Sequence, residues 1–229
     1  MLIVLSQLLC GLAWGYVVAS LCESFFHRHI LHANARFRQL WKRHPLIFGV
    51  CQSAYYTHHV IHHVRSFRQS FVTQFLDEQE RQCVDAGIPE AYRRQVRAEK
   101  YGTTLTKIGA LWYVAPSLPV FLVTFLVCGR WVTFGMAVPI LLLYPWMSMV
   151  VHPFIHRRYK DAVAELSYPL SWFMSTRYMR FVIRHHYLHH QYIKCNYNLL
   201  IGADLLLGAH RSASAEDLEK MDLLGLPID

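Results

Sequence analysis

The sequence predicts an all-α integral membrane protein, in which a bundle of membrane-spanning helices carries a cytoplasmic helical cap. Three observations predict this fold class. First, 54% of the residues are hydrophobic and only 17% are charged, whereas about 25% are charged in an average soluble domain. Second, three apolar stretches approach the roughly 20 helical residues that cross a bilayer. Third, histidines gather in clusters beside these stretches. Because 229 residues leave no room for a separate soluble module, we expect one domain over residues 1–229.

The expected membrane spans are residues 2–22, 108–127 and 131–152. The first stretch lacks the basic start and the small-residue cleavage site of a secretory signal, so we interpret it as a span. Prolines interrupt the other two stretches, which membrane helices tolerate when neighbouring groups satisfy the freed carbonyls. We expect these two spans to form a hairpin that turns at the segment CGRW.

The distribution of basic residues predicts the orientation. Of the 23 lysines and arginines, only Arg130 lies in the turn of the hairpin, and the others lie between residues 28 and 107 or beyond residue 156. Cytoplasmic segments carry the excess of basic residues in membrane proteins. Residues 23–107 and 153–229 therefore form the predicted cytoplasmic cap, on either a bacterial inner membrane or the endoplasmic reticulum. The net charge of +8 fits a basic face against anionic headgroups, and no pattern typical of nucleic-acid binding is present.

The main candidate functional motifs are two almost identical histidine blocks, HHVIHH at 58–63 and HHYLHH at 185–190. Residues three and four apart share one face of a helix, so each block can direct three imidazoles at one point. The segment HPFIH at 152–156 has the same spacing. His27 and His32 are five apart, which places them about 140° out of line on a regular helix, so this pair requires an irregular helix end. The predicted metal ligands are His27, His32, His59, His62, His63, His152, His156, His186, His189 and His190.

Neighbouring histidines leave this ligand set open. His29, His58 and His185 each adjoin a cluster and could replace a neighbour as ligand, while His44 and His210 are interpreted as background. A structural zinc closes with four ligands, so ten imidazoles indicate two ions. Ligand type alone does not select the metal. Oxidation of an unactivated C–H bond would need a redox metal and oxygen, which favours iron over zinc.

The order of these motifs resembles the fatty acid hydroxylase superfamily of integral-membrane di-iron oxygenases, which includes sterol desaturases, fatty acid hydroxylases and carotenoid hydroxylases. The matching motifs are HxxxxH from His27, HxxHH from His59, HxxxH from His152 and HxxHH from His186. The segment NYNLLIGADLLLG after the last motif is similar to a segment of the family that ends in D-x-x-x-G. The resemblance covers residues 23 to about 208.

The resemblance implies a membrane-bound hydroxylase with two non-haem iron ions and dioxygen as co-substrate. It also implies a lipid-like substrate that enters from the bilayer, such as a fatty acyl, sterol or isoprenoid chain. A separate electron donor of the ferredoxin or cytochrome b5 type, with its reductase, would be the protein partner. No catalytic residue is implied beyond the metal centre. A desaturase or a carotenoid ring hydroxylase would use the same centre.

A protein that binds or transports divalent metal without catalysis is the alternative from another class. Against transport, residues 109–151 contain no acidic residue and no histidine, and such residues mark ion paths inside a membrane. A bis-histidine haem protein would need paired histidines within the spans, whereas these histidines cluster at the ends of spans.

Four polar residues are predicted partners of the ligands, because ligating histidines usually donate their free N–H to an acid or a carbonyl. One of them stands a turn before His27 at the end of an apolar stretch, where an acid indicates function by default. The other three follow the last histidine motif. The set is Glu23, Asn196, Asn198 and Asp204.

The remaining segments are predicted to be scaffold helices. Residues 71–86 and 89–100 are expected to form two polar helices divided at AGIP, where glycine ends the first and proline suits the start of the second. Residues 168–184 alternate bulky apolar and basic groups, as an interfacial helix does. Ser214 and Asp217 predict a capped helix near the C-terminus.

Overall fold

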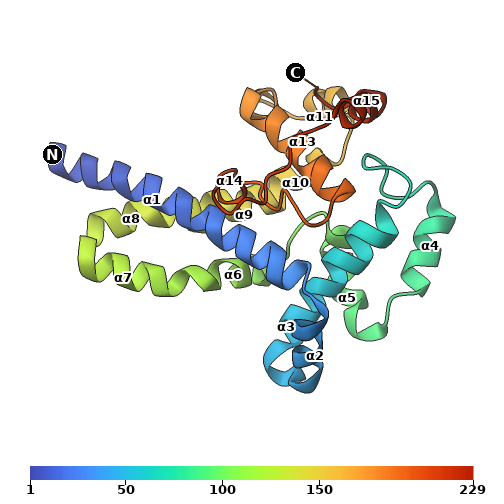
Figure 1. The fold of residues 1–229 in the computed structure, drawn as a ribbon, viewed down its shortest axis with the longest axis horizontal. Coiled ribbons are helices and arrows are strands. Elements are labelled where there is room, and N and C mark those ends of the chain that lie inside the picture. The colour runs from blue at the N-terminus through green and yellow to red at the C-terminus, as the bar shows by residue number, and fades with distance from the viewer. Residues whose placement is uncertain (229) are drawn as a thin grey trace.

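The computed structural model describes residues 1–228, which form helices and contain no strand (Figure 1). The long apolar part comprises α1 (Leu2–Phe26), α6 (Lys107–Val114), α7 (Leu118–Cys128), α8 (Arg130–Val138), α9 (Tyr144–Trp146) and α10 (His152–Ile155). The other α-helices are α2 (Ala35–Arg43), α3 (Pro45–Tyr55), α4 (Glu78–Ala86), α5 (Glu90–Ala98), α11 (Tyr159–Glu165), α12 (Leu170–Met174), α13 (Arg177–Gln191), α14 (Ala203–Leu206) and α15 (Ala215–Leu223). Four segments are π-helical, η1 (His27–Leu31), η2 (Tyr56–Ser66), η5 (Pro139–Leu143) and η6 (Met147–Val151), and two are 3-10 turns, η3 (Lys100–Gly102) and η4 (Ala115–Ser117).

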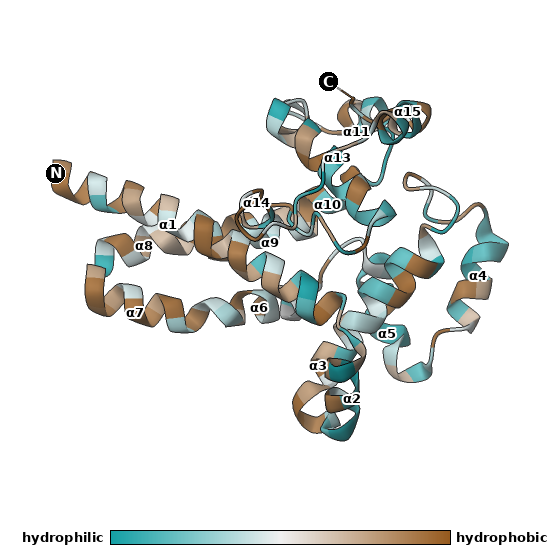
Figure 2. Ribbon diagram, viewed as in Figure 1, coloured by the Kyte–Doolittle hydropathy of each residue, from teal (hydrophilic) through white to brown (hydrophobic). Residues whose placement is uncertain are grey.

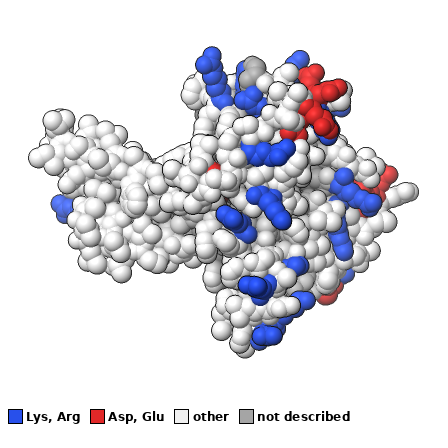
Figure 3. Space-filling model, viewed as in Figure 1, with Lys and Arg blue, Asp and Glu red and all other residues white. Residues whose placement is uncertain are grey.

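Three continuous helical stretches within the described residues are long and apolar enough to cross a membrane: Leu2–Leu31, Gly109–Cys128 and Arg130–Ile155. They form the arm that extends away from the rest of the molecule, and this arm is largely brown in the hydropathy view (Figure 2). Charged residues are almost absent from the visible face of the arm and gather on the rest of the molecule, here called the body, which contains α2–α5 and α11–α15 (Figure 3). The three predicted spans are therefore confirmed as long apolar helices, but the first and third extend further than predicted, so that His27 and His152 lie in their last turns.

The first and third spans are held together by a close backbone contact. Gly11 and Gly15 of α1 face Gly135 and Met136 of α8, and all four are buried. A Cβ added at Gly135 would lie 2.4 Å from the carbonyl oxygen of Leu8. Small residues at such a crossing allow two membrane helices to approach closely enough for extensive van der Waals contact.

The body packs its helices onto the inner ends of the spans. Met136, Ile140 and Val151 of the third span share one buried cluster with Val182 and Ile183 of α13. The same cluster continues into α1 and α15 through further buried apolar residues, among them Val18, Ala19 and Met221. This shared core fixes the histidine-bearing helix α13 relative to the ends of the spans.

The scaffold helices are shorter than predicted. The helix expected over 71–86 begins only at Glu78, because the side chain of Asp77 accepts a hydrogen bond from the backbone N–H of Glu80 and caps the helix there. The helix expected over 168–184 is divided, because the side chain of Thr176 caps α13 by accepting from Met179 N. The C-terminal helix is confirmed, with Ser214 and Asp217 forming a reciprocal capping box.

Candidate metal centre

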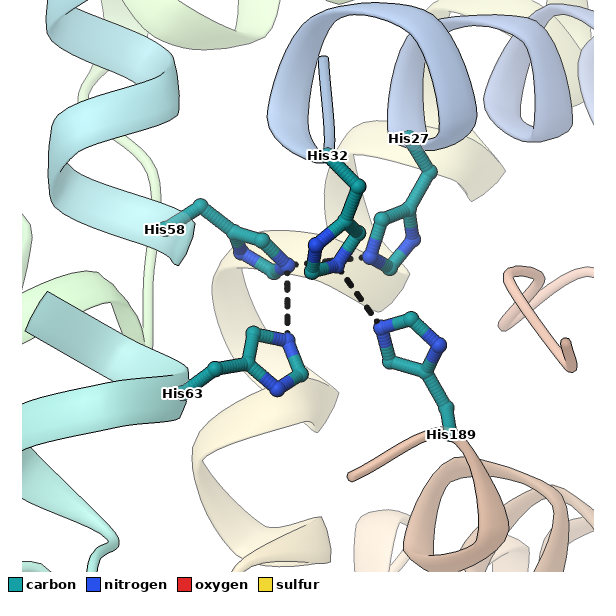
Figure 4. A group of neighbouring side chains, drawn as sticks. All are labelled: His27, His32, His58, His63 and His189. Carbon is teal, nitrogen blue, oxygen red and sulfur yellow. Dashed lines mark hydrogen bonds between the residues drawn. The ribbon is translucent and has the colours of Figure 1, made fainter. Parts of the chain in front are cut away.

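Histidines from all four sequence clusters converge where the spans meet the body. The first group consists of five residues, drawn in Figure 4, from η1 and the residue that ends it, from η2 and from α13: His27, His32, His58, His63 and His189. The second group consists of His62, His152, His156 and His186. A third set, His62, His63 and His190, joins the two groups, because it shares one member with each. Within each of these sets, the potential ligand nitrogens lie within 4.8 Å of one another.

The nitrogen separations fit ligands around a common ion. In the first group, His58 Nε2 lies 2.9 Å from His27 Nε2 and 3.1 Å from His63 Nε2. In the second group, His186 Nε2 lies 2.9 Å from His152 Nε2. Metal–imidazole bonds of about 2.0–2.1 Å place adjacent nitrogens roughly 2.9 Å apart at right angles and roughly 3.4 Å apart at tetrahedral angles. The measured separations lie in this range.

Backbone carbonyls determine which nitrogen of each ring faces inward. His27 Nδ1 donates to Tyr197 O at 2.5 Å, and His189 Nδ1 donates to Cys195 O at 2.8 Å. A carbonyl oxygen can only accept, so each Nδ1 carries the proton and each Nε2 keeps its lone pair in the neutral ring. The two carbonyls therefore orient two rings of the first group as ligands.

In the second group, backbone carbonyls again hold Nδ1 protons, and two Nε2 atoms face each other. His152 Nδ1 donates to Thr103 O at 2.8 Å, and His156 Nδ1 donates to Phe71 O at 3.1 Å. The two Nε2 atoms of these rings nevertheless face each other at 3.3 Å. Two neutral rings in this tautomer present two lone pairs to each other and form no hydrogen bond, so the contact is favourable only with a cation between them.

Burial keeps these rings neutral. His62 is fully buried, and burial, followed by the neighbouring His156 and His152, holds its pKa well below the usual range. Burial similarly lowers the pKa of His189 to about 4. Both nitrogens of His62, and Nε2 of His190, are buried without a hydrogen-bond partner. An unpaired buried polar atom carries a desolvation cost of about 1–3 kcal/mol, which coordination to a metal would remove.

Helix geometry explains how histidines five apart converge. His32 N donates to His27 O at 3.0 Å, the i to i+5 pattern of a π-helix, and the two rings stack at 5.1 Å. This is the irregular helix end that the five-residue spacing requires. His58 and His63 have the same spacing within η2, which is π-helical along its whole length. Single π turns are frequent at functional sites.

The π-helical register places His58, rather than the predicted His59, in the first group. His59 lies at the edge: its Nδ1 is 2.9 Å from His32 Nδ1, and its ring stacks on Tyr55. All other predicted ligands belong to one of the three sets. The sequence left the choice between these two neighbours open, because an ideal α-helix places His59, not His58, on a face with His62 and His63.

The other histidines of the clusters lie outside the three sets. His29 contacts the rings of Phe25 and Phe37. His185 Nε2 lies 2.9 Å from Asp204 Oδ2, with both side chains buried, and its ring stacks on His210. His29 and His185 therefore make contacts outside the three sets.

The predicted polar partners build the loop that supplies two of the carbonyls. The carboxylate of Glu23 accepts hydrogen bonds from the backbone N–H groups of Leu199 and Leu200, both at 2.8 Å, and from Asn198 Nδ2 at 3.1 Å. Asp204 Oδ2 accepts from Asn198 N at 2.8 Å. These residues therefore act on the ligands through the loop.

Asn196 completes this loop at its other end. Its side chain donates to Arg211 O and accepts from Arg211 N, and its φ is 56°, in the left-handed region that asparagine adopts more readily than most residues. The direct partners of the ligand rings are main-chain carbonyls, which carry no signature in the sequence. Sequence reasoning therefore missed Tyr197, Cys195, Thr103 and Phe71.

A small cavity lies against both main groups. It measures about 40 Å³ and is lined by His27 and His58 of the first group and by His152 and His186 of the second. A second cavity of about 40 Å³ shares Leu31, His58 and Leu105 with it. This second cavity reaches Phe26, Val50 and Trp112. Trp112 is 43% exposed on the second span.

Comparisons with protein-family models, with curated proteins and with solved structures find no match to this chain. Its own features define it as a helical protein with three potential membrane spans and buried histidine groups that could hold metal. All six cysteines are free, so the fold relies on no disulfide.

Proposed function

We propose that this chain is a membrane-bound, O2-dependent di-iron oxidoreductase that hydroxylates a lipid-like substrate. The observation that carries the proposal is the second group, in which two Nε2 lone pairs face each other at 3.3 Å while both Nδ1 protons are held by carbonyls. Together with the first group, it provides two adjoining sets of neutral nitrogen ligands. Two sets of this size exceed the four ligands of one structural zinc site.

Iron is the metal that matches the membrane setting of the centre. Two bound iron ions would supply the redox chemistry by which dioxygen oxidises an unactivated C–H bond, with electrons from a separate donor of the ferredoxin or cytochrome b5 type. The carbonyls of Tyr197 and Cys195 hold the Nδ1 protons of His27 and His189, so both rings keep a fixed tautomer. Such outer partners tune metal affinity and activity.

The cavities support a substrate that arrives from the bilayer. Among the residues that line both cavities, Leu31 and Leu105 are apolar, and the second cavity extends to Trp112, which is partly exposed on a potential span. A carbon of an acyl, sterol or isoprenoid chain that reached the first cavity would lie beside histidines of both groups. A desaturase or a carotenoid ring hydroxylase remains the alternative on the same centre.

The proposal is tested by a single-turnover reaction. The purified protein is loaded anaerobically with ferrous iron, supplied with bacterial or microsomal lipid extract, and then exposed to oxygen. Mass spectrometry should detect a lipid with one added oxygen atom, and isotopically labelled dioxygen should label it. Loss of two hydrogens instead would identify a desaturase.

The matched variants for this reaction are His62→Ala and Arg36→Gln. The first removes a ligand shared by two sets and should abolish the product, whereas the second changes an exposed residue of α2 and should not. A protein that binds metal tightly but leaves every lipid unchanged with iron, reductant and oxygen present would instead support metal binding without catalysis.

A further inference from the structure

A pocket separate from the histidine groups lies between the α2–α3 hairpin and α5. It measures about 350 Å³, and its lining includes Arg38 and Lys42 of α2, Gln52 of α3, Tyr56 of η2 and Tyr92 of α5. No aspartate or glutamate lines it. The wall is thus rich in hydrogen-bond donors and carries positive charge with no carboxylate to balance it.

Three buried donors of this wall have no partner: Arg38 Nε, Gln52 Nε2 and Tyr56 Oη. The Arg38 guanidinium also donates from Nη1 to Tyr55 Oη at 2.9 Å and lies over the Tyr55 ring. Buried polar groups in native proteins are nearly always paired, and an unpaired group calls for an explanation. All three donors belong to residues that line this one pocket, and rotation of their side chains toward it would pair them with a ligand that has several acceptor oxygens.

The remaining walls are aromatic. Tyr56 stacks on Tyr92 at 4.5 Å, and Trp41 is 2% exposed. The same hairpin presents apolar side chains outward: Leu46 is fully exposed and Ile47 is 70% exposed, and α3 is largely brown in Figure 2. Exposed apolar side chains beside a basic face are typical of an element that lies in a membrane interface.

From these observations we propose that this pocket binds an anionic oxygen group, a carboxylate or a phosphate, and that the group belongs to the headgroup of a lipid. Arg38 makes charge-assisted hydrogen bonds to the anion, Lys42 adds a second positive charge, and Tyr56 and Gln52 donate to its oxygens. Charge-assisted hydrogen bonds of this kind are the strong ones. The inference does not depend on the oxidation chemistry proposed above, because the anion would bind with or without a reaction.

The pocket lies next to the metal centre without being part of it. Tyr55 stacks on His59 at 5.0 Å, and His59 Nδ1 lies 2.9 Å from His32 Nδ1 in the first group. A headgroup bound by Arg38 is therefore separated from the first group by Tyr55 and His59. Such a site would retain a lipid beside the centre while its chain remains in the bilayer.

Short water-soluble probes test this proposal without the complication of lipid partition. We would titrate the full chain, in an uncharged detergent, with hexyl phosphate, hexanoate, inorganic phosphate and hexanol by isothermal titration calorimetry. The proposal predicts saturable binding of hexyl phosphate or hexanoate. If inorganic phosphate binds as tightly as hexyl phosphate, the pocket binds a free phosphate ion. If inorganic phosphate binds more weakly, the bound anion is the headgroup of a lipid.

The variants include Lys42→Gln at an exposed position, which should fold as the unmodified chain does. Arg38→Gln should weaken anion binding about tenfold or more, the effect of losing a charge-assisted hydrogen bond. Lys42→Gln, at an exposed position of the same helix, should weaken it several-fold without affecting folding. Arg36→Gln is the control, because Arg36 lies on the same helix but does not line the pocket. This variant should bind the anion as the unmodified chain does.

Tyr56→Phe gives an independent readout. The variant removes an unpaired buried hydroxyl, so thermal stability without ligand should stay equal or increase, while anion affinity falls. The proposal is overturned if neither hexyl phosphate nor hexanoate binds, if hexanol binds as tightly as they do, or if Arg38→Gln and Lys42→Gln both leave the affinity unchanged.

Discussion

At the scale of single residues, the centre is defined by which ring nitrogens keep a lone pair. Four rings, His27, His152, His156 and His189, donate Nδ1 to main-chain carbonyls. Their Nε2 atoms therefore keep the lone pair and face the other histidines of each group. His62 has no hydrogen-bond partner at either nitrogen, and it links the second group to the third set, as His63 links the first group to that set.

The first prediction separates two adjacent histidines. His58→Ala should weaken metal binding strongly, because His58 Nε2 lies close to Nε2 atoms of two other members of the first group. His59→Ala should leave it nearly unchanged, because His59 lies outside the three sets. The measurement is the rate at which a chelator removes metal from each purified variant. Faster loss from His59→Ala than from His58→Ala would contradict the π-helical register of η2.

At the scale of elements, the loop after α13 holds the ligands of two distant segments in place. Ser20 Oγ donates to Leu200 O at 2.6 Å and accepts from Ala203 N at 2.8 Å, while the Glu23 carboxylate accepts from Leu199 N and Leu200 N. The loop is thereby fastened along one face of α1. Its carbonyls at 195 and 197 then reach His189 and His27.

The second prediction tests this fastening. Glu23→Ala should lower the stability by roughly 2–5 kcal/mol, because two buried backbone N–H groups lose their acceptor. Metal affinity should fall with it, since the loop no longer orients His27 and His189. Thermal denaturation and metal content provide the two readouts. Glu219→Ala, an exposed acid on α15, is the control, and equal behaviour of the two variants would show that the loop does not depend on Glu23.

The third prediction concerns the contact between the first and third spans. Gly135→Ala should destabilise the protein by about 3 kcal/mol or more, at the upper end of overpacking costs, because the new Cβ would lie 2.4 Å from a backbone oxygen. Gly49→Ala on α3 is the matched control, since a Cβ there meets no atom within 4 Å. Alanine in a helix interior is favoured over glycine by about 0.5–1 kcal/mol. Opposite shifts in thermal denaturation temperature are therefore expected, and a shared direction would contradict the close helix contact.

Parts of this arrangement could be predicted from the sequence and parts could not. The spans are encoded by apolar length, and most of the ligands by the three- and four-residue spacing around His62 and His189. The choice of His58 over His59 depends on π-helical turns, which are rare and have no simple sequence signal. The carbonyl partners depend on contacts such as Glu23 with Leu199, which are 176 residues apart. Only the folded chain brings these together.

At the scale of the whole molecule, the histidine groups lie where the spans meet the charged body. The helix α1 has 25 residues, about 37 Å at 1.5 Å per residue, which exceeds the ~30 Å hydrocarbon core. The segment η1, which continues α1 and begins at His27, therefore extends to the interface if the N-terminal end of α1 enters the bilayer. Under the proposed function, a metal centre in this position would receive substrate from the lipid and electrons from the aqueous side.

The fourth prediction concerns the sides of the membrane. Cys128 lies at the end of α7, in the turn of the helical hairpin, and Cys83 lies on α4 of the body, and both are exposed. If the three apolar helices cross the bilayer, these thiols lie on opposite sides. Single-cysteine versions in sealed vesicles of known orientation, treated with a membrane-impermeant maleimide, should label at one position only. Equal labelling of Cys128 and Cys83 from the same side would contradict a spanning arm.

The most direct test of the whole account is the metal content of the anaerobically purified chain. Elemental analysis should find close to two iron ions per chain, with the content reduced in both His62→Ala and His189→Ala, because these variants remove ligands from different groups. His59→Ala should retain the content of the unmodified chain. Zinc alone at one ion per chain, or a metal content that neither ligand variant changes, would contradict the di-iron centre.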